Sequence, residues 1–162
     1  MTGWMAPVGA TVEWRTPRSV FDALGLDFDL DPASPPGGVP WIPAARFVDR
    51  EEDGLSIPWT GRVWLNPPYG RDLPRFVGRM ATHRNGVALL PSRTETRWWQ
   101  STALTADAVC FLDRRLHFVR VDGTSGRSDH PSCLMAWGAM SYSAVVRCGL
   151  GWTVTRNRLA PR

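Results

Sequence analysis

Segments whose apolar residues have helical spacing alternate along the chain with short apolar runs. Apolar residues at helical spacing predict helices over residues 17–24, 72–82 and 94–104, and short apolar runs predict strands at 28–31, 63–65, 86–91 and 108–112. The run at 86–91 has no polar interruption, which is typical of a strand buried on both faces. Because strands and helices alternate, the pattern predicts a single-domain α/β fold, an open sheet with mostly parallel strands.

The last third of the chain departs from this alternation. Two apolar runs, at 116–121 and 132–137, flank a polar loop at 122–130 and predict an antiparallel hairpin at an edge of the sheet. Residues 152–155 predict one more short strand, and residues 156–162 are expected to fray. The expected sheet is therefore mostly parallel with an antiparallel C-terminal hairpin.

Between the first two predicted strands, residues 33–61 show no clear period. Prolines and glycines interrupt this segment repeatedly, so we expect a long irregular crossover. Irregular loops of this length are uncommon inside compact domains and usually have a function. The crossover starts where a strand ends at Asp31-Pro32, and ligands of open α/β sheets bind beyond such strand ends.

The composition indicates what kind of binding partner and which cellular compartment to expect. The 162 residues suit one domain, and 19 basic against 15 acidic residues give a formal net charge of +4, which favours a polyanionic partner. Cys110, Cys133 and Cys148 lack metal-ligand spacing, so the sequence predicts free thiols of a reducing compartment and no metal site. Neither a secretory signal nor an apolar run of about 18 residues is visible, so we expect a soluble intracellular protein.

The strand predicted at 63–65 ends in Asn66-Pro67-Pro68-Tyr69. The two prolines fix φ and remove two backbone donors, so this segment is stiff and its carbonyl oxygens have no partner in the sheet. Such a segment suits a planar ring that carries an exocyclic NH2. The Asn66 amide oxygen and the Pro67 carbonyl would accept the two N–H bonds and favour the pyramidal nitrogen of the transition state. Tyr69 would stack on the ring.

This segment resembles the Asp/Asn-Pro-Pro-Tyr/Phe catalytic motif of amino-methyltransferases that use S-adenosylmethionine. Further blocks in the same order extend the resemblance to the phage DNA N-6-adenine-methyltransferase family over nearly the whole chain. They lie at 13–17, 20–21, 28–33, 53–55, 59, 63–69, 87–91, 93–94, 96, 98, 111–116 and 118. The resemblance implies a reduced Rossmann-like methyltransferase domain that methylates the N6 amine of a flipped adenine in double-stranded DNA. It also implies a phage- or prophage-encoded enzyme in the cytoplasm of a bacterial host.

The same resemblance implies roles for individual positions. Thr16 and Pro17 would lie near the methionine part of the cofactor, and Asp31, Pro32 and Ala33 would form the cofactor loop. Asp53, with Leu55 beside it, would lie by the cofactor's adenine. The single domain, 1–162, would then consist of a cofactor-side segment at 11–60, which includes the irregular loop 33–61, a catalytic core at 62–121 and a DNA-facing loop at 122–130.

Candidate DNA contacts lie in two places. Arg93, Thr94 and Thr96 follow the strand at 86–91, on the same rim as Asn66, where they would contact phosphates. The loop 122–130, with Arg120, Arg127 and His130, is the candidate for base readout or strand insertion, although solvated arginines on a plain hairpin loop would look the same. A homodimer, which would add surface to so small a chain, is left open.

Other interpretations of the same residues stay open. Asp31 could be a strand-ending residue that caps a turn, and Asp53 could belong to an ordinary Asp-Gly turn in a solvated acidic cluster. Cytosine N4, RNA adenine and the glutamine amide of a protein also present an NH2 beside a planar group. A different kind of interpretation is a DNA-binding or decoy protein without turnover. It is motivated by the cofactor loop, in which no Gly-x-Gly follows Asp31.

Overall fold

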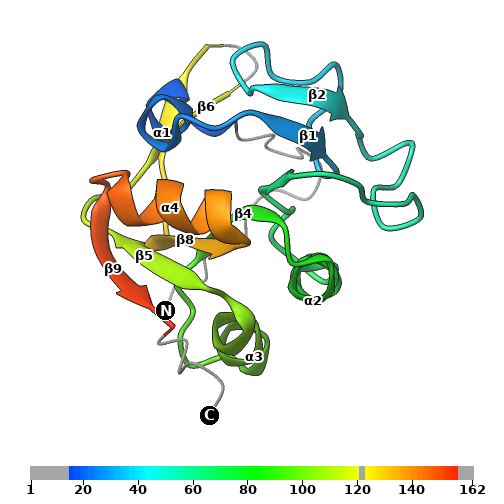
Figure 1. The fold of residues 1–162 in the computed structure, drawn as a ribbon. Coiled ribbons are helices and arrows are strands. Elements are labelled where there is room, and N and C mark those ends of the chain that lie inside the picture. The colour runs from blue at the N-terminus through cyan, green and yellow to red at the C-terminus, as the bar shows by residue number, and fades with distance from the viewer. Residues whose placement is uncertain (1–14, 121–122, 157–162) are drawn as a thin grey trace, which may run out of the picture.

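A seven-stranded mixed sheet organises the part of the chain that the computed structural model describes, residues 15–120 and 123–156 (Figure 1). Its strands are β1 (Phe28–Asp31), β2 (Ala44–Phe47), β3 (Val63–Leu65), β4 (Gly86–Pro91), β5 (Ala108–Leu112), β8 (Ser132–Trp137) and β9 (Gly151–Thr155). Their spatial order is β2-β1-β3-β4-β8-β5-β9. A separate two-stranded sheet pairs β6 (His117–Val119) with β7 (Ser125–Arg127).

The strands β2, β1, β3 and β4 are parallel, so their carboxyl ends lie along one edge of the sheet. β8 runs antiparallel between β4 and β5, and β9 pairs antiparallel with the outer side of β5. The predicted α/β class is therefore confirmed as an open mixed sheet, with parallel core strands and antiparallel later strands.

Two hydrophobic cores fill the opposite faces of this sheet. Helices α1 (Arg18–Leu24) and α4 (Ala139–Arg147) pack on one face, and α2 (Leu73–His83) and α3 (Arg97–Thr105) pack on the other (Figure 1). Along β4, Val87 and Leu89 belong to the first core, whereas Ala88 and Leu90 belong to the second. Because both faces are covered, β3, β4 and β8 are buried throughout.

The predicted pairing of residues 116–121 with 132–137 is wrong. β6 pairs instead with β7, with Phe118 opposite Gly126, and β8 lies inside the main sheet. All six residues of β8 are buried. A strand of this kind is stable between two hydrogen-bonded neighbours with helices over both faces, whereas at an edge its unpaired backbone groups would be exposed.

Besides β7, which lies in the predicted loop 122–130, two elements have no counterpart in the sequence prediction. The edge strand β2 lies within the segment expected to be irregular, and its side chains are half-buried or exposed, so no apolar run marks it. Helix α4 begins after Gly138, whose φ of +86° favours glycine, and it buries only Ser141, Ala144 and Val145. Its apolar stripe is correspondingly weak. The last predicted strand is confirmed as β9, and residues 157–162 lie outside the described residues.

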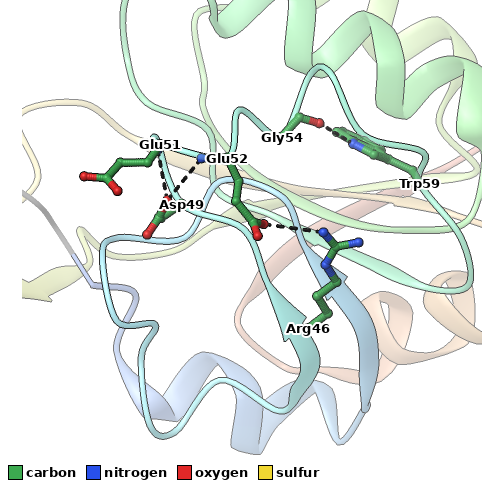
Figure 2. Close-up of polar contacts among 6 residues, drawn as sticks. All are labelled: Arg46, Asp49, Glu51, Glu52, Gly54 and Trp59. Carbon is green, nitrogen blue, oxygen red and sulfur yellow. Dashed lines mark hydrogen bonds and ion pairs between the residues drawn. The ribbon is translucent and has the colours of Figure 1, made fainter.

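Residues 33–61 are held by polar contacts of their own, in addition to β2 (Figure 2). The Asp49 carboxylate accepts hydrogen bonds from the backbone N–H groups of Glu51 and Glu52, at 2.9 and 3.4 Å. Arg46 of β2 lies 3.4 Å from the Glu52 carboxylate, and the Trp59 indole donates to the Gly54 carbonyl at 2.7 Å. The crossover is therefore a folded segment, with one edge strand and fixed turns.

Helix α2 fixes the end of this crossover. Arg79 donates from its guanidinium to the carbonyl oxygens of Leu55 and Ile57 and lies 5.0 Å from the centre of the Trp59 ring. One arginine thus joins the helix to two backbone groups and an aromatic face. Within residues 15–120 and 123–156, no helix has the length and apolar character needed to cross a bilayer.

Candidate active site

Asn66 to Tyr69 leave the sheet at the carboxyl end of β3, next to the end of β1. All four residues line a cavity of about 640 Å³, a volume typical of sites for small ligands. Pro67 is buried, whereas Pro68 is exposed and the Tyr69 side chain keeps 46% of its surface exposed. The stiff segment is therefore open to a ligand on one side.

Three parts of the chain form most of the wall of this cavity, and Arg50 after β2 also lines it. The loop after β1 contributes residues 33–36, and the turn after β3 contributes residues 66–69 and Asp72. The third wall is the end of the β6–β7 hairpin, residues 126–130, with Phe118 of β6. The cavity therefore lies at the edge of the sheet where the parallel strands end, as expected for an open α/β sheet.

The Asn66 side chain is hydrogen-bonded to Thr16. The Asn66 amide nitrogen donates a hydrogen bond to the Thr16 hydroxyl oxygen at 3.1 Å, and Thr16 is only 1% exposed. Among the described residues, no hydrogen bond reaches the Asn66 amide oxygen or the Pro67 carbonyl. Both oxygens are therefore available to a donor in the cavity. Thr16 directly precedes Pro17, the N-cap of α1.

The Tyr69 ring forms the aromatic part of the cavity wall. Desolvation against the neighbouring protein raises the pKa of the Tyr69 phenol above its ordinary value. The phenol is therefore neutral at physiological pH. A neutral, partly exposed ring at the mouth of a cavity is suited to stacking on a planar ligand.

Asp31 ends β1 and is 2% exposed. Its carboxyl accepts a hydrogen bond from the Ala33 backbone N–H at 3.2 Å, and no ion pair involves it within residues 15–120 and 123–156. Desolvation by burial raises the pKa of Asp31 from 3.8 to about 7, and the Ala33 bond opposes this shift only partly. Ala33 lines the cavity, whereas Asp31 and Pro32 lie behind it. The buried carboxyl thus has capacity for a further donor.

Asp53 lies in a tight turn outside the cavity wall. Its φ is +54°, and its carboxylate accepts hydrogen bonds from the Ser56 hydroxyl at 2.5 Å and the Leu55 backbone N–H at 3.1 Å. These bonds lower the pKa of Asp53, the Ser56 bond most strongly. The structure thus gives Asp53 a role in the turn, and Leu55 is likewise not a cavity residue. A role of either beside a cofactor stays a prediction.

Gly54 packs directly on the backbone of the loop that carries Asp31 to Ala33. A Cβ atom at this position would lie 1.8 Å from the Pro32 carbonyl oxygen. The turn at 53–55 therefore supports Pro32 from behind, and the Trp59 indole holds the Gly54 carbonyl in place (Figure 2).

We expect Gly54→Ala to lower the free energy of unfolding by about 1–3 kcal/mol, because the added methyl group overpacks the contact with Pro32. Urea denaturation measures this change. Gly78→Ala in α2 is the matched control, because its Cβ would meet no atom within 4 Å. That control should stabilise the protein by up to about 1 kcal/mol. A Gly54→Ala variant as stable as the parent would contradict the close contact.

The β6–β7 hairpin brings Arg127 and His130 to the wall of the cavity. Arg115 fixes the hairpin by donating to the Ser128 carbonyl at 3.1 Å. Arg120, the third residue predicted for this loop, is exposed but does not line the cavity. Asp122, the first residue of the predicted loop, lies outside the described residues.

Arg93, Thr94 and Thr96 follow β4 and do not line the cavity. The Thr96 hydroxyl donates to the Arg93 carbonyl at 2.7 Å, and Gln100 donates to the Thr94 carbonyl at 3.0 Å. These bonds form the turn that leads into α3. The Arg93 and Thr94 side chains are exposed on the same edge of the sheet as Asn66, and their predicted contact with DNA stays a prediction.

Two charged wall residues, Arg50 and Asp72, were not predicted from the sequence. Arg50 reaches the cavity because β2 is parallel to β1 and ends at the same edge, and β2 itself carries no apolar signal. Asp72 pairs with Arg75 at 3.0 Å in front of α2. The sequence did offer one indication for Asp72, its position three residues after Tyr69. Nothing in the sequence indicated the hydrogen bond between Thr16 and Asn66, because it joins residues fifty positions apart.

Comparison with known protein families matches residues 6–148 to the family described as DNA N-6-adenine-methyltransferase (Dam). No curated protein and no solved structure matches the chain. The match includes every described helix and strand except β9, and the sheet is consistent with a methyltransferase fold. Family membership identifies an adenine-specific DNA methyltransferase, and it implies S-adenosylmethionine as the methyl donor and DNA as the substrate. The chain therefore belongs to the DNA N-6-adenine-methyltransferase family.

Proposed function

We propose that the chain methylates the N6 amine of an adenine that has left the stack of double-stranded DNA and entered the cavity beside Asn66–Tyr69. The observation that carries this proposal is the position of these four residues on an open cavity, with the Asn66 amide nitrogen already bonded to Thr16. Unstacking the base costs a few kcal/mol, which stacking in the cavity and phosphate contacts offset.

The two available oxygens would bind the amine. An aryl amine is a poor nucleophile because its lone pair is delocalised into the ring. When Asn66 and Pro67 accept its two N–H bonds, the pyramidal nitrogen of the transition state is favoured over the planar ground state. Tyr69 would stack on the base and contribute about 1–3 kcal/mol. No general base is needed before the attack, since the proton can leave afterwards.

The residues around Asp31 fit the cofactor that the family uses. S-adenosylmethionine supplies a methyl group bonded to a positively charged sulfur. Among the described residues the buried Asp31 carboxyl accepts one hydrogen bond, so it can accept a further bond from a charged or hydroxyl donor. Pro17, Pro32 and Ala33 belong to the proposed cofactor side, and Asp53 and Leu55 support it from the turn that packs on Pro32.

The β6–β7 hairpin would contact the DNA. Arg127 and His130 line the same cavity as Tyr69, where they would contact the flipped nucleotide. The proposed outer contacts are Arg93, Thr94, Thr96 and Arg120. A formal net charge of +4 favours a polyanion, and arginine binds phosphate oxygens through paired N–H donors.

Labelled S-adenosylmethionine and unmethylated genomic DNA test this function. After incubation with the purified protein, the DNA is digested to nucleosides and analysed by mass spectrometry. The expected product is N6-methyladenosine in its deoxy form, and sequencing with modified-base detection then gives the site. Exclusive methylation of cytosine N4, or of RNA supplied in parallel, would contradict the proposed substrate. A protein that binds DNA without any transfer would support the decoy interpretation.

A further inference from the structure

We infer that Thr16 is a positioning residue for Asn66: its hydroxyl oxygen holds the amide nitrogen, so that the amide oxygen is presented to the amine in the cavity. This inference rests on the proposed function of Asn66. It assigns to Thr16 a task within the reaction that differs from the contact with the methionine part of the cofactor suggested by its position in the sequence.

The orientation of an asparagine amide decides whether it can bind an amine through the amine's N–H bonds. Its oxygen accepts such a bond, whereas its NH2 group would meet the amine N–H donor to donor. The last torsion of the side chain has a broad, roughly two-fold profile, so the covalent structure does not distinguish the two orientations. A hydrogen bond to a neighbouring group can hold the amide in place, and the amine then favours the orientation in which the amide oxygen faces it.

Thr16 supplies an acceptor on the side away from the cavity. When the Asn66 oxygen faces the amine, the amide nitrogen faces inward and requires an acceptor of its own. The Thr16 hydroxyl oxygen lies 3.1 Å from that nitrogen and is 1% exposed, so water does not compete for this position. The Thr16 hydroxyl could also donate to the oxygen of a reversed amide, but reversal would lose the bond to the amine, which only the amide oxygen can accept.

The position of Thr16 is itself fixed from two directions. The preceding residue, Arg15, pairs with Val119 of β6 through two backbone hydrogen bonds, at 2.8 and 3.1 Å. The Trp41 indole donates to the Thr16 carbonyl at 2.8 Å. The hairpin and the crossover thus hold Thr16, while β3 holds Asn66. An acceptor fixed on separate elements can maintain one side-chain orientation during binding.

Thr16→Val, which keeps the shape but removes the acceptor, is the decisive variant. We expect it to lower the single-turnover rate of methyl transfer by about 10- to 100-fold, the loss that corresponds to one buried hydrogen bond. Thr16→Ser should restore the rate to within about threefold. The dissociation constant for S-adenosylmethionine, measured by calorimetry, should change by less than about twofold. Thr82→Val is the matched control at a threonine in α2 outside the cavity, and it should leave the rate unchanged.

A double-mutant cycle tests whether Thr16 acts through Asn66. In an Asn66→Ala background, Thr16→Val should cause no further loss of rate. An equal loss in both backgrounds would overturn the inference, and so would a rate unchanged by Thr16→Val alone. A cofactor dissociation constant weakened tenfold at an unchanged rate would assign Thr16 to the cofactor instead.

The side-chain amide signals of Asn66 in a nitrogen–proton NMR spectrum test the same bond without turnover. We expect Thr16→Val to shift both amide protons and Thr16→Ser to restore their positions. If the parent protein transfers no methyl group but shows this pattern, the proposed function fails while the orienting bond stands. If the parent is active and the signals do not respond to Thr16→Val, the inference about Thr16 fails alone.

Discussion

Asn66→Ala is expected to lower the rate constant of methyl transfer by about 10²- to 10³-fold, the range measured when one preorganised group is removed from a developing charge. In the proposed reaction Asn66 accepts an N–H bond as the nitrogen becomes positively charged. The alanine variant leaves that bond to water or leaves it unmade. Because the amide acts on the transition state more than on the ground state, kcat should fall more than the affinity for DNA.

The variant should remain folded. Asn66 is half-buried, and within the described residues its side chain makes one hydrogen bond, to Thr16, so we expect its removal to lower the free energy of unfolding by about 1–2 kcal/mol. Single-turnover kinetics with excess enzyme give the chemical rate, and urea denaturation gives the stability. Asn85→Ala is the matched control, because Asn85 is an exposed asparagine outside the cavity, bonded to the Gly61 carbonyl at 3.0 Å.

Asn66→Asp provides a graded comparison. The carboxylate keeps two acceptor oxygens, so it should retain more activity than the alanine variant, provided that the Thr16 hydroxyl rotates to donate to it. Equal activity of the alanine variant and the parent would refute the role of Asn66 in transfer. Loss of activity together with global unfolding would show instead that the residue is needed for the fold.

The motif after β3 could be predicted because all the residues that define it are adjacent in the sequence. A three-residue apolar strand and the rigid turn Asn66-Pro67-Pro68-Tyr69 follow one another in the sequence, and the structure places them at a cavity as expected. β1 and Asp31 are likewise contiguous in the sequence, although Ala33 rather than Asp31 lines the cavity. A strand that ends in a polar residue at the carboxyl edge of a parallel sheet requires no knowledge of distant partners to suggest a site.

Strand order and cavity walls depend on partners far apart in the chain. Residues 132–137 form the hydrogen-bonded neighbour of both β4 and β5, and only the buried surface on both of their faces selects that position over the nearby hairpin. Arg50 reaches the cavity through β2, a strand with exposed side chains. Predicting such placements requires knowledge of how the whole sheet packs, and the local spacing of apolar residues does not contain it.

The burial of Asp31 could also not be predicted from the sequence. It leads us to expect a large, pH-dependent change in stability when Asp31 is replaced. An aspartate at the end of a strand is usually solvated, whereas this one is 2% exposed and its pKa is raised to about 7. In the unfolded chain the carboxyl ionises near its ordinary value of 3.8. Below that pH both states are protonated, and the group does not affect stability. As the pH rises from about 4 to 7, only the unfolded state loses the proton, so the folded state loses stability.

We therefore expect Asp31→Asn to stabilise the protein at pH 8 by about 4 kcal/mol, the free energy that corresponds to the rise in pKa. The substituted amide oxygen can still accept the Ala33 N–H bond, and the gain should disappear at pH 4. Urea denaturation at pH 4, 6 and 8 measures this profile. Asp22→Asn is the control on α1, where the carboxylate is 66% exposed, and it should change the stability by less than about 1 kcal/mol at every pH.

Binding of the cofactor should change in the opposite direction. If Asp31 accepts a bond from a charged donor of S-adenosylmethionine, the affinity of the parent should rise as the pH passes about 7, because the ionised carboxylate is the better acceptor. Asp31→Asn should bind the cofactor about 10- to 100-fold more weakly and show no such rise. A variant that is more stable yet binds as tightly as the parent would remove Asp31 from the cofactor site. A variant that binds weakly and is stabilised would show that the carboxyl is retained for binding at a cost to the fold, since burial of the charge is unfavourable until the ligand supplies its partner.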